Sequence, residues 1–234
     1  DNNYASEEEI FQQSKLHYIA PNRREDPEII SAALQGPLEP VIEPGDIRGI
    51  IHSHSNWSDG LHTIETMAKA CIEKGYEYLI ISDHSKSAFY AGGLSIDSVK
   101  AQHREIDALN KKLAPFVIFK SIESDILNDG SLDYPEEILE SFDIVIASIH
   151  SNLKMTEEKA MMRLLNAINN PYTSILGHPT GRLLLSRKGY PVNHAAIIEA
   201  CANNNVVIEL NAHPRRVDMD LRYIEVHFQK ILLI

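Results

Sequence analysis

The sequence predicts an α/β protein whose parallel strands form a compact β/α barrel. The chain has 234 residues, of which 44% are apolar, so it is long enough to bury a substantial core. From Arg48 onward, short β-rich runs alternate with helical patterns, which is typical of the βα units of a parallel sheet. Six or seven such units fit into the chain beyond residue 45, and this number favours a barrel. An open, doubly wound sheet is the alternative.

The first 45 residues differ from the remainder. A helical pattern begins at Glu7 and a second, short one follows around residues 28–34. Pro37, Pro40 and Pro44 then interrupt any regular element, because proline removes a backbone donor and fixes φ. We therefore expect residues 1–45 to form an appendage and linker, and residues 46–234 to form the main domain.

The elements of the main domain follow from local periodicity. Strands are predicted at 49–52, 78–82, 116–122, 143–148, 174–176 and 206–210, with a last strand beginning near Ile231. Helices are predicted at 64–74, 96–113, 136–140, 157–168, 194–202 and 221–229. Thr156, directly before two glutamates, is a good helix N-cap.

Composition and missing motifs exclude several classes of protein. The longest apolar runs are a few residues, far short of the roughly 20 that span a bilayer, and the acidic N-terminus does not resemble a signal peptide. Two distant cysteines give no disulfide framework, so we expect a reduced, cytoplasmic setting without a membrane partner. The chain lacks a Walker loop, a dinucleotide-binding glycine pattern, a nucleophile elbow and an HExxH helix.

The 11 histidines are the unusual feature of the composition, and many of them stand where a predicted strand ends. In a parallel β/α barrel the carboxyl ends of the strands share one face, so side chains distant in sequence converge there. This argument gathers seven candidate metal ligands: His52, His54, Asp59, His84, Glu123, His150 and His178. Imidazoles with carboxylates suit Zn, Mn or Fe, and seven ligands exceed the need of one ion. We therefore expect two or three divalent ions, Mn²⁺ or Zn²⁺, with Fe²⁺ as a further option.

Local charge predicts the class of ligand. The net charge of −11 disfavours a nucleic-acid partner at first sight, yet the segments around the predicted site are cationic. Such a basic rim on an acidic body fits a phosphate-bearing ligand. The substrate-binding candidates are Lys86, Tyr90, Arg182, Arg215 and Arg216. Tyr90 is placed either to stack on a base or to pack within its loop. His213 is a further candidate for contact with the substrate, and Asp83 either orients His84 or serves as a hydrogen-bonding residue at the strand end.

Several spaced motifs resemble a known family. They are His52-Ser53-His54 with Ser58-Asp59-Gly60, Ser82-Asp83-His84-Ser85-Lys86-Ser87, Glu123, His150 and Gly177-His178-Pro179-Thr180-Gly181-Arg182. Together they resemble the polymerase and histidinol phosphatase (PHP) family, and most closely the C-terminal PHP domain of bacterial family X DNA polymerases. The run Glu209-Leu210-Asn211-Ala212-His213-Pro214-Arg215-Arg216 is similar to that branch, and Tyr18-Ile19-Ala20-Pro21 resembles the closing stretch of the polymerase core.

The resemblance implies a distorted seven-stranded TIM-like barrel with three metals. His52, His54 and Glu123 would hold the first, Glu123 would bridge to a second held by His150 and His178, and Asp59 with His84 would hold the third. The family completes its site with an Asp-x-His pair after the last strand, whereas this chain stops at Ile231-Leu232-Leu233-Ile234. We therefore expect a chain truncated at the last strand, with the first and third metals one ligand short.

The implied function is a metal-dependent phosphoesterase that acts on DNA 3′ ends. It would be a 3′-5′ exonuclease, with 3′-phosphatase and abasic-site cleavage as further activities, within a bacterial family X DNA polymerase that works in DNA repair and carries its polymerase core in cis. Divalent ions activate water, which Glu123, His150 and His178 would position here. The alternatives are a small-molecule phosphatase of the histidinol phosphate type and a metal-stabilised structural module for an attached polymerase.

Overall fold

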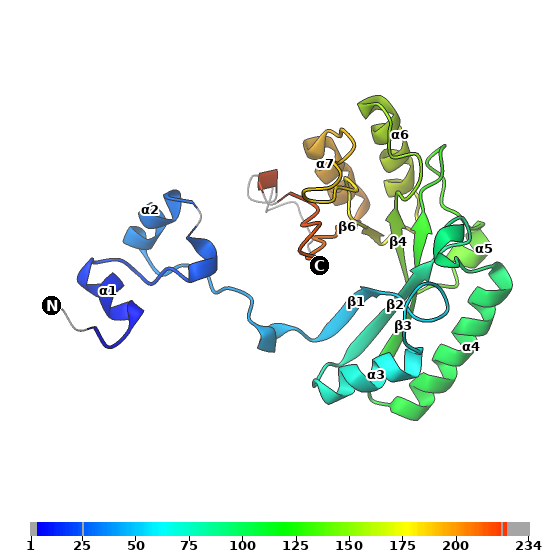
Figure 1. Ribbon diagram of the computed structural model, residues 1–234, viewed down its shortest axis with the longest axis horizontal. Coiled ribbons are helices and arrows are strands. Elements are labelled where there is room, and N and C mark those ends of the chain that lie inside the picture. The colour runs from blue at the N-terminus through cyan, green and yellow to red at the C-terminus, as the bar shows by residue number, and fades with distance from the viewer. Residues whose placement is uncertain (1–3, 25, 221, 224–234) are drawn as a thin grey trace. The chain divides into compact units, whose positions relative to one another are not determined.

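The computed structural model describes residues 4–24, 26–220 and 222–223 (Figure 1). The chain divides into two compact units, Asp1–Ile47 and Arg48–Ile234. The predicted last strand near Ile231 lies outside the described residues. Of the helix predicted at 221–229, only residues 222 and 223 are described. Each unit is considered by itself.

The first unit is small and mostly helical. It contains helices α1 (Glu7–Gln13) and α2 (Glu28–Gln35) and the 3₁₀ turns η1 (Pro21–Arg23) and η2 (Pro44–Asp46). An ion pair between Arg24 Nη2 and Glu7 Oε2 of 2.8 Å joins α1 to the segment after η1. Few apolar side chains are buried here, Ile19 and Ala33 among them, so this unit has little core of its own.

The second unit is built on one parallel sheet of six strands among the described residues, in the order β1-β2-β3-β4-β5-β6. Every strand therefore pairs with its neighbours in sequence, as in a β/α barrel, whereas a doubly wound sheet reverses its strand order. The α/β, barrel-type fold is confirmed, and the doubly wound alternative is wrong. The strands are β1 (Gly49–Ser53), β2 (Tyr78–His84), β3 (Val117–Asp125), β4 (Ile144–Ser148), β5 (Ile175–Leu176) and β6 (Val207–Ile208).

Helices follow the strands and cover the sheet (Figure 1). They are α3 (Ile64–Glu73), α4 (Ile96–Leu113), α5 (Glu136–Leu139), α6 (Glu157–Ile168) and α7 (His194–Asn204), with a 3₁₀ turn η3 (Phe89–Ala91) after β2. In Figure 1, α3 and α4 lie beside β1–β3, and α6 and α7 lie beside β4–β6. Four of these helices begin at a side-chain N-cap, provided by Thr63, Ser95, Thr156 and Asn193.

Two apolar clusters fill the spaces between helices and sheet. One includes Ile64 and Ala68 of α3, Ile106 of α4 and strand residues such as Leu79. The other packs α6 and α7 against β3–β6 and includes Leu164, Ile168, Ile197 and Ile198. Both cysteines, Cys71 and Cys201, are buried and unpaired. Among the described residues, no helix combines the length and apolar character needed to cross a membrane.

Candidate metal centre

Glu123 is the centre of a cluster of histidines at the carboxyl ends of the strands. It lies near the end of β3 and is 1% exposed. One oxygen, Oε1, faces three imidazoles, with His52 Nε2 at 3.1 Å, His150 Nε2 at 3.0 Å and His178 Nε2 at 2.9 Å. His52 lies near the end of β1, and His150 and His178 follow β4 and β5, so the parallel sheet itself brings them to one carboxylate oxygen.

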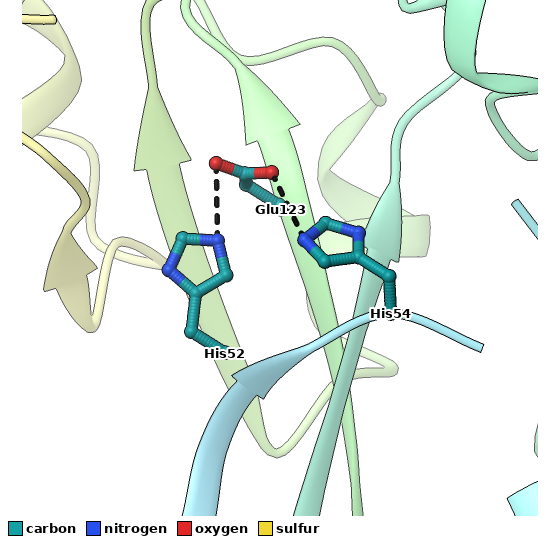
Figure 2. Close-up of side chains that lie close together, drawn as sticks. All are labelled: His52, His54 and Glu123. Carbon is teal, nitrogen blue, oxygen red and sulfur yellow. Dashed lines mark ion pairs between the residues drawn. The ribbon is translucent and has the colours of Figure 1, made fainter. Parts of the chain in front are cut away.

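The second oxygen of Glu123 faces the other two histidines. Oε2 lies 3.1 Å from His84 Nδ1 and 3.6 Å from His54 Nε2. Figure 2 shows the imidazoles of His52 and His54 on the two sides of the Glu123 carboxylate. Asp59 completes this side, with oxygens 3.6 Å from His54 Nδ1 and 3.7 Å from His84 Nε2. All seven side chains predicted as ligands are therefore gathered in one place.

The backbone brings His52 and His54 together in an unexpected way. The HxH spacing in a regular strand would place both side chains on one face. Instead, the β1–β2 register shifts between Ile50 and Ser53, and His52 has φ of 55°. His178, after β5, also has a positive φ, of 22°. Non-glycine residues in this region carry strain, which is common at functional sites.

The donor set fits divalent transition metals. Three groups of side chains place their ligand atoms within 4.8 Å of one another among the described residues: His52 with His54 and Glu123, His54 with Asp59 and His84, and His84 with Glu123 and His150. Two ligands about 2.1 Å from one ion are separated by roughly 3.0–3.4 Å, close to the spacing of donors around Glu123. Among the residues that the structure describes, the buried Nδ1 atoms of His54 and His178 have no hydrogen-bond partner, which leaves them available to another ligand.

The residues of the cluster shift one another's pKa values. Burial opposes ionisation of Glu123, but the charge of His52 and hydrogen bonds from His150 and His178 outweigh it and hold the pKa of this carboxyl well below its usual range. Burial also opposes protonation of His52, yet Glu123 and Glu209 raise its pKa to about 10. For His54 and His84, burial prevails and lowers the pKa, which favours the neutral, metal-binding imidazole.

Two carboxylates contact candidate ligand histidines at Nδ1, the ring nitrogen that faces away from Glu123. The sequence alone assigned no role to either carboxylate. Glu209 Oε1 lies 2.5 Å from His52 Nδ1, and its Oε2 accepts a hydrogen bond of 2.6 Å from the backbone N–H of His178. Asp125 Oδ1 contacts His150 Nδ1. Asp125 follows Glu123 by two residues on the same strand, so strand alternation was a usable signal for it. Glu209, like Glu123, follows an apolar run within a predicted strand, so the signal that marked Glu123 was also available for it.

Asp83 supports the loop that carries two of the candidate ligands. Its carboxylate accepts hydrogen bonds from Ser55 N at 2.8 Å, Ser55 Oγ at 2.6 Å and Ser58 Oγ at 2.5 Å. Gln102 Nε2, on α4, donates a further one of 2.7 Å. These contacts agree with a hydrogen-bonding role at the strand end and fix the segment between His54 and Asp59.

A cavity of about 330 Å³ opens over the cluster. Besides the seven candidate ligands, it is lined by Tyr90, Asn211, His213 and Arg216. Two of the five substrate-binding candidates, Tyr90 and Arg216, therefore line it. Sequence reasoning missed Asn211 and weighed His213 only as a minor candidate, because both lie in a loop after β6 whose path no periodicity predicts.

The other three substrate-binding candidates lie elsewhere among the described residues. Lys86 Nζ is 5.6 Å from the centre of the Tyr134 ring. Arg182 donates to the backbone oxygens of Arg216 and Val217 and pairs with Asp220 at 2.6 Å, so it holds the loop after β6. Arg215 is exposed, and its backbone oxygen accepts a hydrogen bond from Leu184 N.

Comparison with known proteins agrees with the fold and the cluster. The chain is 44% identical over 216 residues to the DNA polymerase/3′-5′ exonuclease PolX of Bacillus subtilis, an alignment that covers 92% of this chain and 38% of that protein. It is 29% identical over 178 residues to a probable phosphatase of Caldanaerobacter subterraneus subsp. tengcongensis, covering 70% of this chain and 63% of that one. The chain thus spans less than two thirds of either relative.

A solved structure of histidinol phosphate phosphatase from Lactococcus lactis, complexed with Zn, L-histidinol and phosphate, superposes with a TM-score of 0.46 and 17% identity over 69% of this chain and 72% of that one. The PHP domain family model matches residues 51–213, a range that begins beside His52 and ends at His213. It contains all seven residues of the cluster, and the resemblance drawn from the motifs is confirmed: the chain belongs to the PHP domain family.

Proposed function

We propose that this PHP-domain phosphoesterase acts on the 3′ ends of DNA as a 3′-5′ exonuclease, with 3′-phosphatase and abasic-site cleavage as related activities. The observation that carries the proposal is the Glu123 cluster in a cavity whose wall also holds Arg216 and Tyr90. That arrangement combines ligands for divalent ions with a cation and an aromatic ring, which suit the phosphates and the bases of a nucleic acid. The similarity to the Bacillus subtilis DNA polymerase/3′-5′ exonuclease supports the same substrate.

His52, His54 and Glu123 would hold one ion, Asp59 and His84 another, and Glu123 with His150 and His178 a third. Zn²⁺ and Mn²⁺ suit this nitrogen-rich donor set. The chemistry that divalent ions supply in such a centre is Lewis-acid activation of water and neutralisation of phosphoryl oxygens. The chain itself contributes the spacing of the donors, which the strand ends of a rigid sheet fix.

Arg216 is suited to orient a substrate phosphate. Its Nη1 is buried without a hydrogen-bond partner among the described residues, and the residue lines the cavity. A guanidinium donates to phosphate oxygens in a fixed planar geometry. Arg182 keeps the Arg216 backbone in place by donating from Nε to its carbonyl oxygen at 3.0 Å. The cationic charge at the cavity therefore comes from Arg216, with Arg182 as its support.

Tyr90 offers a surface for a base. It is 72% exposed, stands 6.1 Å from the ring of His84 and follows Phe89, which is 88% exposed. Stacking of bases on exposed aromatic rings stabilises single-stranded nucleic acid in a sequence-tolerant way. Partial desolvation and the charges of nearby carboxylates raise the pKa of Tyr90 to about 12, so its O–H stays a hydrogen-bond donor well above neutral pH.

The proposal is tested by incubating the metal-loaded protein with a 3′-labelled single-stranded oligonucleotide. Release of the labelled 3′-terminal mononucleotide is expected in Mn²⁺ or Zn²⁺. His52→Ala is expected to lose this activity, whereas His62→Ala, which changes an exposed histidine outside the cavity, is expected to keep it. An uncut oligonucleotide, with His52→Ala indistinguishable from the unmodified protein, would contradict the proposal.

A small-molecule phosphatase is the second candidate, favoured by the similarity to the probable phosphatase of Caldanaerobacter. Its discriminating measurement is turnover of histidinol phosphate relative to single-stranded DNA under the same metal conditions. Faster turnover of histidinol phosphate would favour this candidate. Bound metal without hydrolysis of either substrate would favour the structural role.

We propose further that the chain is part of a family X DNA polymerase, with residues 1–45 linking to a polymerase core in cis and 46–234 forming the phosphoesterase domain. The alignment with the Bacillus subtilis protein supports this, because it runs through 92% of this chain and through only 38% of that protein. The division of the structure between Ile47 and Arg48 lies two residues from the expected boundary.

A further inference from the structure

Glu209 lies one residue beyond the end of β6 and contacts two candidate metal ligands, His52 and His178. It is 8% exposed, and its backbone N–H donates to Leu176 O of β5 at 3.0 Å, so the main chain at this position is fixed by the sheet. The side chain has no lysine or arginine partner among the described residues. A buried carboxylate is costly unless it is paired and hydrogen-bonded, so its partners indicate its role.

The first partner is the side chain of His52. Glu209 Oε1 lies 2.5 Å from His52 Nδ1, while the opposite ring atom, Nε2, lies 3.1 Å from Glu123 Oε1. A neutral imidazole carries one N–H and one lone pair. Because the Glu209 carboxylate can only accept, it keeps the proton of the neutral, metal-binding form of His52 on Nδ1, and the lone pair of Nε2 then faces the cluster.

The second partner is the backbone of His178. Glu209 Oε2 accepts a hydrogen bond of 2.6 Å from His178 N, at the residue whose φ is 22°. A non-glycine residue holds such a conformation only where its surroundings impose it. With the backbone in this conformation, the His178 side chain places its Nε2 atom 2.9 Å from Glu123 Oε1. One carboxylate therefore fixes two candidate ligands from two different strands.

We propose that Glu209 is a positioning residue of the metal centre: it fixes the tautomer and ring orientation of His52 and the backbone conformation of His178. The inference rests on the proposed metal-dependent function. Asp125 makes the same kind of contact to Nδ1 of His150, whose Nε2 also faces Glu123. Such carboxylate–histidine pairs orient metal ligands, and their removal lowers metal affinity by about 10- to 100-fold.

The test measures metal affinity directly, by competition between the protein and a chelator for Zn²⁺ or Mn²⁺. Glu209→Ala removes both acceptors and is expected to weaken binding of at least one ion by about 10- to 100-fold. Glu209→Gln keeps one acceptor oxygen and is expected to lose less. Glu199→Gln, on the exposed face of α7, is the matched control and is expected to bind metal as the unmodified protein does.

Nitrogen NMR of the Zn²⁺-loaded protein gives a second readout that general destabilisation would not produce. The spectrum is expected to show a strongly hydrogen-bonded N–H at Nδ1 of His52, and the signature of that hydrogen bond is expected to be lost in Glu209→Ala. If Glu209→Ala does not fold, Glu209→Gln, which has nearly the same shape, takes its place. Unchanged metal affinity together with an unchanged His52 signature would overturn the inference. Weakened metal binding in a protein that cleaves no DNA would instead support it and count against the proposed substrate.

Discussion

Arg216 combines two features that suit a residue that binds a ligand. It lines the cavity over the metal-ligand cluster, and its buried Nη1 lacks a protein partner among the described residues. Its own backbone N–H donates to His213 O at 2.7 Å, within the same loop after β6. The guanidinium is therefore positioned by its loop and still has hydrogen-bonding capacity for a ligand.

Arg216→Ala is expected to lower kcat/KM for the DNA substrate by about 10- to 100-fold, since a hydrogen bond to a charged group is worth about 1.5–3 kcal/mol. Metal affinity is expected to stay unchanged, because Arg216 contacts no candidate ligand. Steady-state kinetics and chelator competition measure the two quantities, with Arg104→Ala on the exposed side of α4 as control. Equal kcat/KM in the two variants would remove Arg216 from the substrate site.

Asp125 provides the other residue-level prediction. Its carboxylate contacts Nδ1 of His150, so Asp125→Asn is expected to weaken metal binding by about 10- to 100-fold while His150 itself remains. His150→Ala is expected to be the more severe of the two, because it removes the ligand. Titration of the metal-free proteins with Zn²⁺ or Mn²⁺ gives the comparison. Metal affinity unaffected by Asp125→Asn would show that His150 needs no support from this carboxylate.

At the scale of elements, prediction was most accurate where a segment has a single structural role. The helices predicted at 96–113 and 157–168 occur with those bounds as α4 and α6, because both present a regular apolar face to the sheet. β3, by contrast, was predicted to end at Ile122 and continues to Asp125. Glu123, Ser124 and Asp125 remain paired with β4, although their polarity ends the apolar pattern. The sheet thus extends beyond the hydrophobic signal at the place where it carries the site.

The same limit explains what could not be predicted about the candidate site. The ligand assignment, which stays a prediction, came from residues at strand ends, and parallel topology was sufficient to place them together. The contact of Glu209 with His52 depends on side-chain conformations across β6 and β1, which are distant in sequence. The positions of Lys86 and Arg182 depend on loop paths, so their charge predicted the region of the site but not a place on the cavity wall.

Arg163 of α6 connects the loops that follow β3 and β4. It is fully buried and donates to the backbone oxygens of Leu127, Ser151 and Ile126. Arg163→Met removes these donors, although Leu127 O keeps a hydrogen bond from Gly130 N, and is expected to lower the free energy of unfolding by about 2–5 kcal/mol. Urea denaturation measures the loss, with the exposed Arg104→Met as control. A loss below about 1 kcal/mol would mean that water or another side chain replaces the guanidinium.

His103 of α4 makes stability depend on pH. Its ring packs edge-on against Phe142 at 4.8 Å, and burial, helped by the charge of Lys120, lowers its pKa. The unfolded chain therefore binds a proton more readily, so the contribution to stability is complete above the ordinary histidine pKa, about 6.5, and is lost as the pH falls through the lower value of the folded state. In metal-free protein, His103→Gln is expected to lose less stability than the unmodified chain between pH 8 and pH 5. Equal losses in the free energy of unfolding of the two proteins over this pH range, measured by urea denaturation, would contradict this prediction.

At the scale of the whole molecule, the net charge of −11 and the proposed phosphate-bearing substrate are compatible because charge is distributed unevenly. The loop that lines the cavity at His213 and Arg216, residues 213–216, and the segment hydrogen-bonded to it, residues 182–188, contain five cationic residues and no acidic ones. Glu136 and Glu137, at the start of α5, are examples of acidic residues that do not line the cavity. A locally positive approach on an acidic protein attracts a polyanion to one place.

We propose that one buried carboxylate, Glu123, organises the metals on which hydrolysis depends. The most direct measurement follows metal content and cleavage of 3′-labelled single-stranded DNA in parallel, for the unmodified protein and for Glu123→Gln, with the exposed Glu137→Gln as control. The prediction is that the unmodified and control proteins bind two or three divalent ions and release mononucleotides, whereas Glu123→Gln loses at least one ion and about 100-fold or more in rate. Full metal content and full activity in Glu123→Gln would contradict the claim.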